Sequence, residues 1–230
     1  CIAFCTWVIL FVSHSLHSIF LLHNFLCRKS SAFPAFYFPA ENLASHVTVQ
    51  PLRDMKLHSF TLCFWVQAQN RDSQTILSYC TQERDNELMV TVGSAVGLWV
   101  GGHFVEFPLH HRSEEWLHYC VAWASHSGTA YLWINGAVGK ENHLQRGYVS
   151  QPGGKLVLGK DRDELLGLFS NGFTGRMSYL NLWSWVLSHS DIRTLALCKH
   201  SELKGDVISW GETSMSLSGG VVLVSDLSCR

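Results

Sequence analysis

The chain has 230 residues and a formal net charge of −1, from 17 Lys and Arg against 18 Asp and Glu. This balance argues against nucleic acid as the main partner, because binding to phosphates requires a basic excess or a basic cluster. Hydrophobic residues make up 47% of the chain and charged residues 15%, which argues against disorder for most of its length.

Residues 1–31 differ in composition from the rest of the chain. Cys1–Cys27 contains no Asp, Glu, Lys or Arg and is long enough for a membrane span, which needs about 20 apolar residues, but three histidines interrupt it. It lacks the initial Met and the positive flank of a complete signal peptide. We interpret it as an apolar leader, either a signal or anchor remnant, a membrane span, or a segment outside the domain. We expect one domain over residues 32–230.

From Ala32 onward, the sequence has the pattern of an all-β protein. Short runs rich in β-branched and aromatic residues are separated by turns that contain Gly, which is typical of a two-sheet sandwich. The Asn135-Gly136 pair also predicts a tight hairpin. The expected strands are Thr61–Val66, Glu87–Val92, Leu98–Val100, Phe104–Phe107, His118–Trp123, Tyr131–Ile134, Leu156–Leu158 and Met177–Trp183.

One segment has helical rather than strand periodicity. Leu187, Ile192 and Leu195 fall near the spacing of a single helix face, and Ser188 or Ser190 could cap its first turn. The sequence therefore predicts one short helix at about 190–197, packed on a face of a sheet.

Several runs, taken in chain order, resemble the pentraxin family. The region from about Phe36 to Cys229 is similar to a pentraxin domain, and this resemblance implies a lectin-like jelly-roll sandwich with one helix. The family signature H-x-C-x-[ST]-W matches at His118–Trp123, except that Ala122 replaces Ser or Thr. The other matching runs are Ala35–Pro39, Phe60–Trp65, Leu77–Tyr79, Asp85–Leu88, Leu132–Gly136, Leu156–Gly159 and Trp183–Ser188.

The eight cysteines show no C-x-x-C spacing, so they do not indicate a zinc finger, and their wide spread suits a secreted domain. The resemblance implies the pairs Cys63–Cys120 and Cys198–Cys229, the second as in long and neuronal pentraxins. Cys80 stands where family members usually carry Ala. We interpret it as a buried thiol, or as paired with another chain or an N-terminal cysteine. We expect an extracellular protein, either secreted or the ectodomain of a membrane protein.

The resemblance also implies one calcium site built from oxygen ligands. Asp85 and Asn86 match one half of the family's site, and Asp161 and Asp163, with the Arg162 carbonyl, match the acidic strip that supplies the other half. Read without the family, these residues are also compatible with an ordinary turn and a solvated loop. We expect one ion held between two separated loops, with a dissociation constant on the order of 10⁻⁴ to 10⁻³ M.

Departures from the family pattern argue against a second ion and against a choline ligand. The loop Phe169–Gly175 is shorter than in family members that bind two ions and carries no carboxylate. Where family members that bind phosphocholine carry an aromatic residue and a glutamate, this chain has Thr91 and either His103 or Phe104. The ligand therefore stays open among a glycan, a lipid head group and a protein.

Catalysis is not expected from the candidate motifs. Adjacent positions in Ser188–Asp191 cannot form a triad relay, the pair His110–His111 lacks a further metal ligand at a known spacing, and Glu114–Glu115 is interpreted as a solvated pair. Two functions remain. One is a calcium-dependent recognition module. The other is an adhesion or assembly module of a larger extracellular or receptor protein with little metal dependence. By resemblance to the family, we also expect a homo-oligomer.

Overall fold

The computed structural model describes residues 32–39, 44–69, 73–109, 114–163, 168–170, 172–198 and 203–228. The chain divides into Cys1–Ser31 and Ala32–Arg230, and all described residues belong to the second unit. The expected leader lies outside the described residues and stays a prediction. Within the described ranges, no helix is long and apolar enough to cross a membrane.

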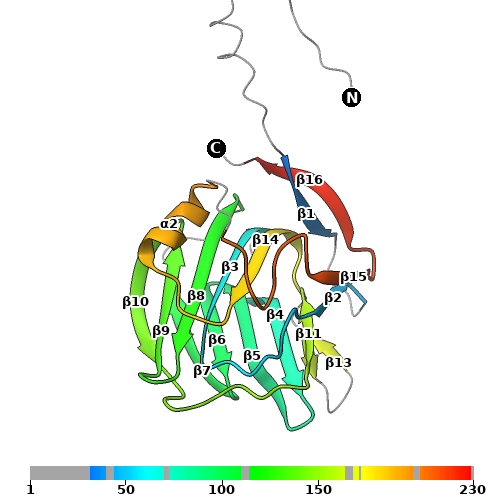
Figure 1. The fold of residues 1–230 in the computed structure, drawn as a ribbon. Helices are drawn as coiled ribbons and strands as arrows, with labels where there is room; N and C mark the ends of the chain where they lie inside the picture. The colour runs from blue at the N-terminus through cyan, green and yellow to red at the C-terminus, as the bar shows by residue number, and fades with distance from the viewer. Residues whose placement is uncertain are drawn as a thin grey trace, which may run out of the picture. The chain divides into compact units, whose positions relative to one another are not determined.

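Two antiparallel sheets pack face to face (Figure 1), which confirms the expected jelly-roll sandwich. Sheet A has the strand order β10-β9-β8-β3-β14-β1-β16. In that order its strands are β10 (Ala137–His143), β9 (Thr129–Ile134), β8 (Leu117–Ala124), β3 (Ser59–Ala68), β14 (Gly175–Trp183), β1 (Ala32–Phe38) and β16 (Val222–Ser228).

Sheet B has the order β15-β2-β11-β4-β5-β6-β7. Its strands are β15 (Ser214–Ser218), β2 (His46–Gln50), β11 (Lys155–Leu158), β4 (Ser73–Thr81), β5 (Arg84–Gly93), β6 (Ala95–Val100) and β7 (His103–Pro108). A separate hairpin of β12 (Asp161–Asp163) and β13 (Leu168–Ser170) contacts β4 and β5 through β12.

The alternation of residues along each strand decides which side chains enter the core. In β3, Leu62 and Phe64 face sheet B and join the main core, which also contains Val90 of β5 and Trp123 of β8. The intervening Cys63 faces the other way and belongs to a second, smaller apolar cluster on the outer face of sheet A. This two-residue period is the physical basis of the strand pattern in the sequence.

The helix, α2 (His189–Ala196), covers that second cluster and begins one residue before the predicted start. Ser188 is its N-cap and accepts a hydrogen bond from the Asp191 amide, and Ile192 is its buried residue. The predicted hairpin is also present: Asn135 and Gly136 have φ values of 50° and 80°, as a two-residue turn of this kind requires.

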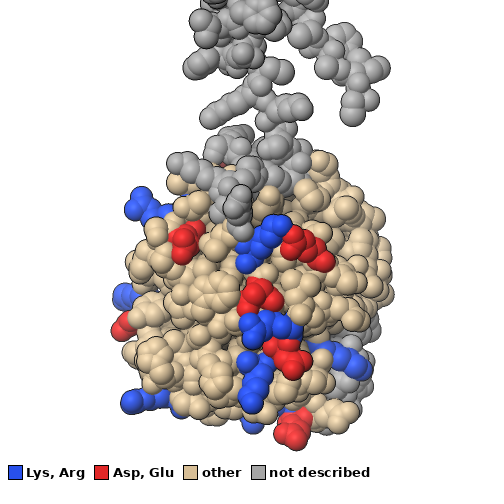
Figure 2. Space-filling view, viewed as in Figure 1, with Lys and Arg blue, Asp and Glu red and all other residues tan. Residues whose placement is uncertain are grey.

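Acidic and basic side chains are interspersed on the face shown in Figure 2, with no area of one sign. This distribution agrees with the near-neutral composition, because a nucleic-acid interface concentrates Lys and Arg on one surface.

Candidate metal centre

The β4–β5 hairpin presents Asp85 and Asn86 at one end of sheet B. The expectation that the candidate ligands lie in two loops is wrong, because Asp85 and Asn86 belong to β5 and Asp161–Asp163 forms β12. Asp161 pairs with Ser170 of β13, and this pairing converts a segment with loop-like composition into a short strand.

Two of the predicted ligand atoms are buried acceptors without a donor. Asp85 Oδ1 and Asn86 Oδ1 are each shielded from solvent, and no described residue donates a hydrogen bond to either atom. A buried polar atom left unpaired costs about 1–3 kcal/mol, so such atoms are rare without a partner. Two unpaired oxygens on consecutive residues are compatible with a hard cation such as Ca²⁺, which takes carboxylate and amide oxygens as ligands.

The third predicted ligand, Asp161, lies over the same pair of strands. Asp161 Oδ1 accepts a hydrogen bond of 3.3 Å from Ser78 Oγ in β4. Ser78 pairs with Met89 of β5, so β12 packs over the strand that carries Asp85 and Asn86. Arg162 and Asp163 follow Asp161 in β12, and their roles as ligands stay predictions.

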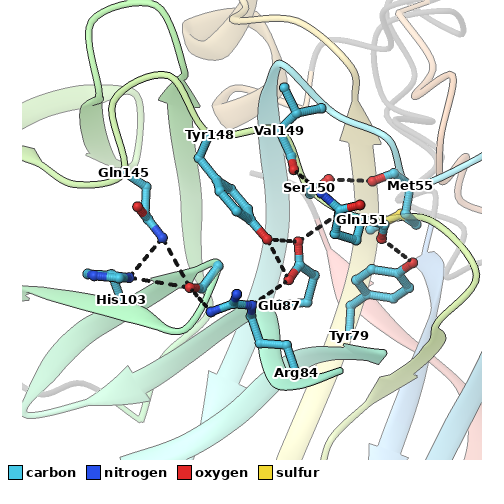
Figure 3. Close-up of polar contacts among 11 residues, drawn as sticks. Met55, Tyr79, Arg84, Glu87, His103, Gln145, Tyr148, Val149, Ser150 and Gln151 are labelled. Atoms are coloured by element: carbon cyan, nitrogen blue, oxygen red, sulfur yellow. Dashed lines mark hydrogen bonds and ion pairs between the residues drawn. The ribbon is translucent and has the colours of Figure 1, made fainter. Parts of the chain in front are cut away.

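A buried carboxylate next to these residues holds the start of β5 in place (Figure 3). Glu87 is 0% exposed and accepts hydrogen bonds from the Tyr148 hydroxyl at 2.7 and 2.9 Å and from the Gln151 amide at 2.7 Å. The Arg84 Nε atom lies 3.3 Å from Glu87 Oε2, and Arg84 Nη1 donates to the Gly101 carbonyl at 2.6 Å.

This network joins three segments that are distant in sequence: the start of β5, the turn after β6, and residues 145–151 (Figure 3). Burial, followed by the neighbouring Glu87 carboxylate, raises the pKa of Tyr148 to about 12. The phenol therefore keeps its proton at physiological pH and remains a donor to Glu87. Sequence reasoning assigned no role to Glu87, because it follows the polar residues Arg84, Asp85 and Asn86 at the start of β5 and does not stand out from them.

The positions considered for a choline ligand carry no carboxylate. Thr91 is buried, and the Phe104 ring lies 4.3 Å from the Trp99 ring with 47% of Phe104 exposed. His103 Nδ1 lies 2.8 Å from Gln145 Nε2. These three groups do not supply the anionic charge that stabilises a quaternary ammonium ion.

A groove between two edge strands is separate from the candidate ligands. It has a volume of about 550 Å³ and lies between the edge strands β7 and β10, where Phe107, Leu132 and Val138 are among its lining residues. Neither Asp85 nor Asp161 lines it, so these candidate ligands lie outside this groove.

The expected disulfide between Cys63 and Cys120 is confirmed, with the two Cα atoms 4.1 Å apart across β3 and β8. Cys198 is disulfide-bonded, but Cys229 lies outside the described residues, so their pairing stays a prediction. Cys80 is buried, as one interpretation had it, and its Sγ atom lies 3.8 Å from the Lys155 carbonyl oxygen.

The motifs weighed for catalysis have structural explanations where the structure describes them. Ser188 and Asp191 form the N-terminal cap of α2, with Ser188 Oγ 2.7 Å from Asp191 Oδ2. Glu114 and Glu115 are exposed, as expected for a solvated pair. The pair His110–His111 lies outside the described residues.

Comparison with known proteins decides the family. The model of the pentaxin family, also spelled pentraxin, matches residues 34–225. The chain belongs to the pentraxin family. It is 32% identical to the mouse serum amyloid P-component over 225 residues, which cover 94% of this chain and 95% of that protein. It is 29% identical to the pig C-reactive protein over 213 residues, covering 91% and 95% of the two chains.

Solved structures share the fold of this pentraxin domain. A heptameric SAP-like pentraxin from Limulus polyphemus superposes with a TM-score of 0.78 at 22% identity, over 86% of this chain and 97% of that one. The full extracellular region of zebrafish Gpr126/Adgrg6 gives a TM-score of 0.67 at 17% identity, over 86% of this chain and 27% of that one. Membership in the family supports a recognition domain rather than an enzyme.

Proposed function

We propose that this domain binds one calcium ion and, through it, recognises a polar ligand or glycan outside the cell. The ligands are the side chains of Asp85, Asn86, Asp161 and Asp163 and the carbonyl oxygen of Arg162. The observation that carries the proposal is that two buried oxygens on consecutive residues, Asp85 Oδ1 and Asn86 Oδ1, receive no hydrogen bond from any described residue.

The charges of the ligand set suit one ion. Asp85, Asp161 and Asp163 contribute three negative charges, which balance one Ca²⁺ and the Arg162 guanidinium. A second ion lacks such compensation, because the segment from Phe169 to Gly175 carries no carboxylate. When bound, calcium supplies coordination positions that oxygen atoms of an external ligand can fill, since it takes six to eight oxygens in total.

The chain's own residues prepare this site before any ion arrives. Glu87 neutralises Arg84, and the Gly101 carbonyl accepts from the same guanidinium. The cation closest in sequence to Asp85 is thereby tied into the network around Tyr148. Ser78 holds Asp161 Oδ1 over β4. These contacts reduce the conformational entropy lost on binding, which favours affinity.

Membership in the family also bears on the assembly and the location of the protein. Cyclic assemblies and an extracellular location are expected for a recognition protein of this kind. The heptameric state of the Limulus pentraxin and the extracellular position of the Gpr126 region are properties of those proteins that support, for this chain, an oligomer and an extracellular role.

Calorimetric titration of the full chain with calcium tests the proposal. We expect one ion per chain with a dissociation constant on the order of 10⁻⁴ to 10⁻³ M. Asp85→Asn and Asp163→Ala should each abolish measurable binding, because each deletes a ligand charge. Asp191→Asn is the matched control, since Asp191 lies on α2 against the other sheet, and it should bind as the parent does.

The same titration separates the two functions that the sequence left open. A recognition module of the proposed kind gains thermal stability on adding calcium, because the ion binds the native state alone. An adhesion or assembly module with little metal dependence shows no calcium heat and an unchanged melting temperature. Two ions per chain, or unchanged binding by Asp85→Asn, would also contradict the proposed site.

A further inference from the structure

The outer face of sheet A holds three side chains of metal-ligating type that the calcium site does not use. Cys63 in β3 lies directly opposite Cys120 in β8, and His118 precedes Cys120 by two residues on the same strand. Residues two apart on a strand point to the same face. One ligand atom from each of Cys63, His118 and Cys120 lies within 4.8 Å of the other two.

The imidazole of His118 is buried and has few hydrogen-bond partners among the described residues. His118 is 2% exposed, its Nε2 atom lies 3.8 Å from Cys120 Sγ, and its Nδ1 atom has no hydrogen-bond partner among the described residues. Histidine binds metals through a ring nitrogen lone pair, and the unpartnered Nδ1 atom leaves the ring without a competing hydrogen bond at that nitrogen.

The surroundings of the cluster select the metal by charge. Trp133, Trp183 and Ile192 pack with the two cysteines in the second apolar cluster, so a net charge here is costly. Two thiolates and one divalent ion sum to zero, whereas two thiolates and one monovalent ion leave a charge of −1. Sulfur and imidazole ligands with a neutral total favour Zn²⁺ over Cu⁺.

We propose that, once the Cys63–Cys120 disulfide is reduced, Cys63, Cys120 and His118 together bind one zinc ion. A dithiol reductant transfers two electrons and two protons: the S–S bond breaks, two S–H bonds form, and the reductant becomes a disulfide. Zinc then releases both thiol protons to solvent and forms two Zn–S bonds and one Zn–N bond.

The strand geometry is compatible with the distances that zinc requires. Zn–S bonds of about 2.3 Å in a tetrahedral site place two sulfurs about 3.8 Å apart. The Cα atoms of Cys63 and Cys120 are 4.1 Å apart, so the two sulfurs reach this separation by side-chain rotation without moving the strands. A water molecule can complete the coordination, as in other zinc sites with three protein ligands. β3 and β8 are thus joined in either redox state.

Cobalt(II) binding to the reduced full chain tests this proposal, because cobalt replaces zinc and its thiolate complexes absorb light. The chain is reduced without oxygen, freed of reductant, and titrated. We expect one Co²⁺ per chain with a thiolate-to-cobalt absorption band, displacement of the cobalt by zinc, and release of two protons per metal. The oxidised chain should give no band.

Variants identify the ligands. Cys63→Ala with Cys120→Ala should abolish the band, and His118→Ala should weaken binding at least tenfold. Cys80→Ala is the matched control, since it removes a buried cysteine from the other sheet, and it should leave the titration unchanged. An unaltered band in either the double cysteine variant or His118→Ala would assign the metal to other residues and overturn the proposal.

Circular dichroism keeps the proposal falsifiable if reduction unfolds the chain. Zinc should then restore the β-sheet spectrum of the reduced parent, and it should raise the melting temperature if the reduced chain stays folded. Zinc should do neither for His118→Ala at the same concentration. A reduced parent that gains neither structure nor stability from zinc overturns the proposal.

Discussion

The two outer faces of the sandwich differ in how their polar atoms are satisfied. On sheet A, Cys63 and Cys120 are covalently joined and lie among apolar side chains under α2. On sheet B, Asp85 and Asn86 present buried oxygens to which no described residue donates, and Asp161 lies over the same strands. The first face is covered by apolar packing, although His118 Nδ1 has no partner among the described residues, whereas the second presents the candidate ligands of the proposed calcium ion.

This difference separates stability from recognition within one fold. Closing a face with apolar contacts and a disulfide contributes free energy to the native state at all times. Leaving acceptors unpaired costs free energy until a cation arrives, which is the arrangement expected of a site that functions by binding. Changes on sheet A should therefore alter unfolding, and changes on sheet B should alter calcium affinity.

Removing the disulfide should produce the largest effect. Cys63→Ala combined with Cys120→Ala opens a loop with a sequence separation of 57, which costs about 4 kcal/mol of unfolding free energy in the chain-entropy model. Calcium affinity of the folded variant should not change, because the proposed ligands lie on sheet B and on the β12–β13 hairpin. Urea unfolding and calorimetric titration measure the two quantities, and a parallel loss of calcium affinity would refute the separation of the faces.

The second-largest effect should come from acid, which should lower the free energy of unfolding through His118 on sheet A. Burial lowers the pKa of His118 from 6.5 to about 3, so between these values the unfolded state binds more protons than the native state. Stability is lost as pH falls through this window, by about 2 kcal/mol between pH 7 and pH 5. In urea unfolding at both pH values, His118→Phe should be less sensitive to pH by this amount, while the exposed His126→Phe should behave as the parent.

Glu87→Gln should affect the sheet B face through the positioning of its ligands. The amide weakens the hold on Tyr148 and leaves the Arg84 guanidinium uncompensated beside Asp85, so calcium affinity should fall about tenfold, or about 1.4 kcal/mol. Glu106→Gln, an exposed change on β7 of the same sheet, is the control. Unchanged affinity together with lowered stability would show that Glu87 has only a structural role.

Ser188→Ala should have the smallest effect on stability, and this effect should be limited to sheet A and the helix that covers it. Loss of the N-cap hydrogen bond to the Asp191 amide destabilises α2 and costs about 1 kcal/mol. Ser190→Ala should cost less, because its hydroxyl contacts the Ser188 hydroxyl rather than a backbone amide. Thermal unfolding of both variants, with and without calcium, measures the effect, and a change in the calcium-induced shift would be unexpected.

The strands that the sequence predicted best are rich in apolar residues. Apolar runs located β3, β5 and β8, most of whose residues are buried. The helix was placed within one residue because its cap and its buried Ile192 are local signals. β10 and β15 were not predicted, because they carry mostly polar, exposed residues and are held by backbone pairing at the sheet edges. Such pairing leaves no hydrophobic period in the sequence.

The candidate site was accessible through the family resemblance rather than through local pattern. Asp85, Asn86 and Asp161 stand out only when their order is compared with pentraxins, since each is also an ordinary turn residue. Glu87 was missed as an anchor because its partner Tyr148 is 61 residues away in sequence. Contacts of this range depend on the folded topology, and a single sequence does not reveal them.

The position of the disulfide has a mechanical consequence. The covalent loop between Cys63 and Cys120 contains β4, β5, β6 and β7, all of which belong to sheet B. A force applied to the two ends of an oxidised chain passes through the cross-link and cannot extend this segment. At 3.3–3.6 Å per residue, the shielded contour length is about 200 Å. Asp85 and Asn86 lie inside the shielded loop, whereas Asp161 lies outside it. Tension would therefore separate Asp161 from Asp85 and Asn86 before it extended the segment that carries Asp85 and Asn86.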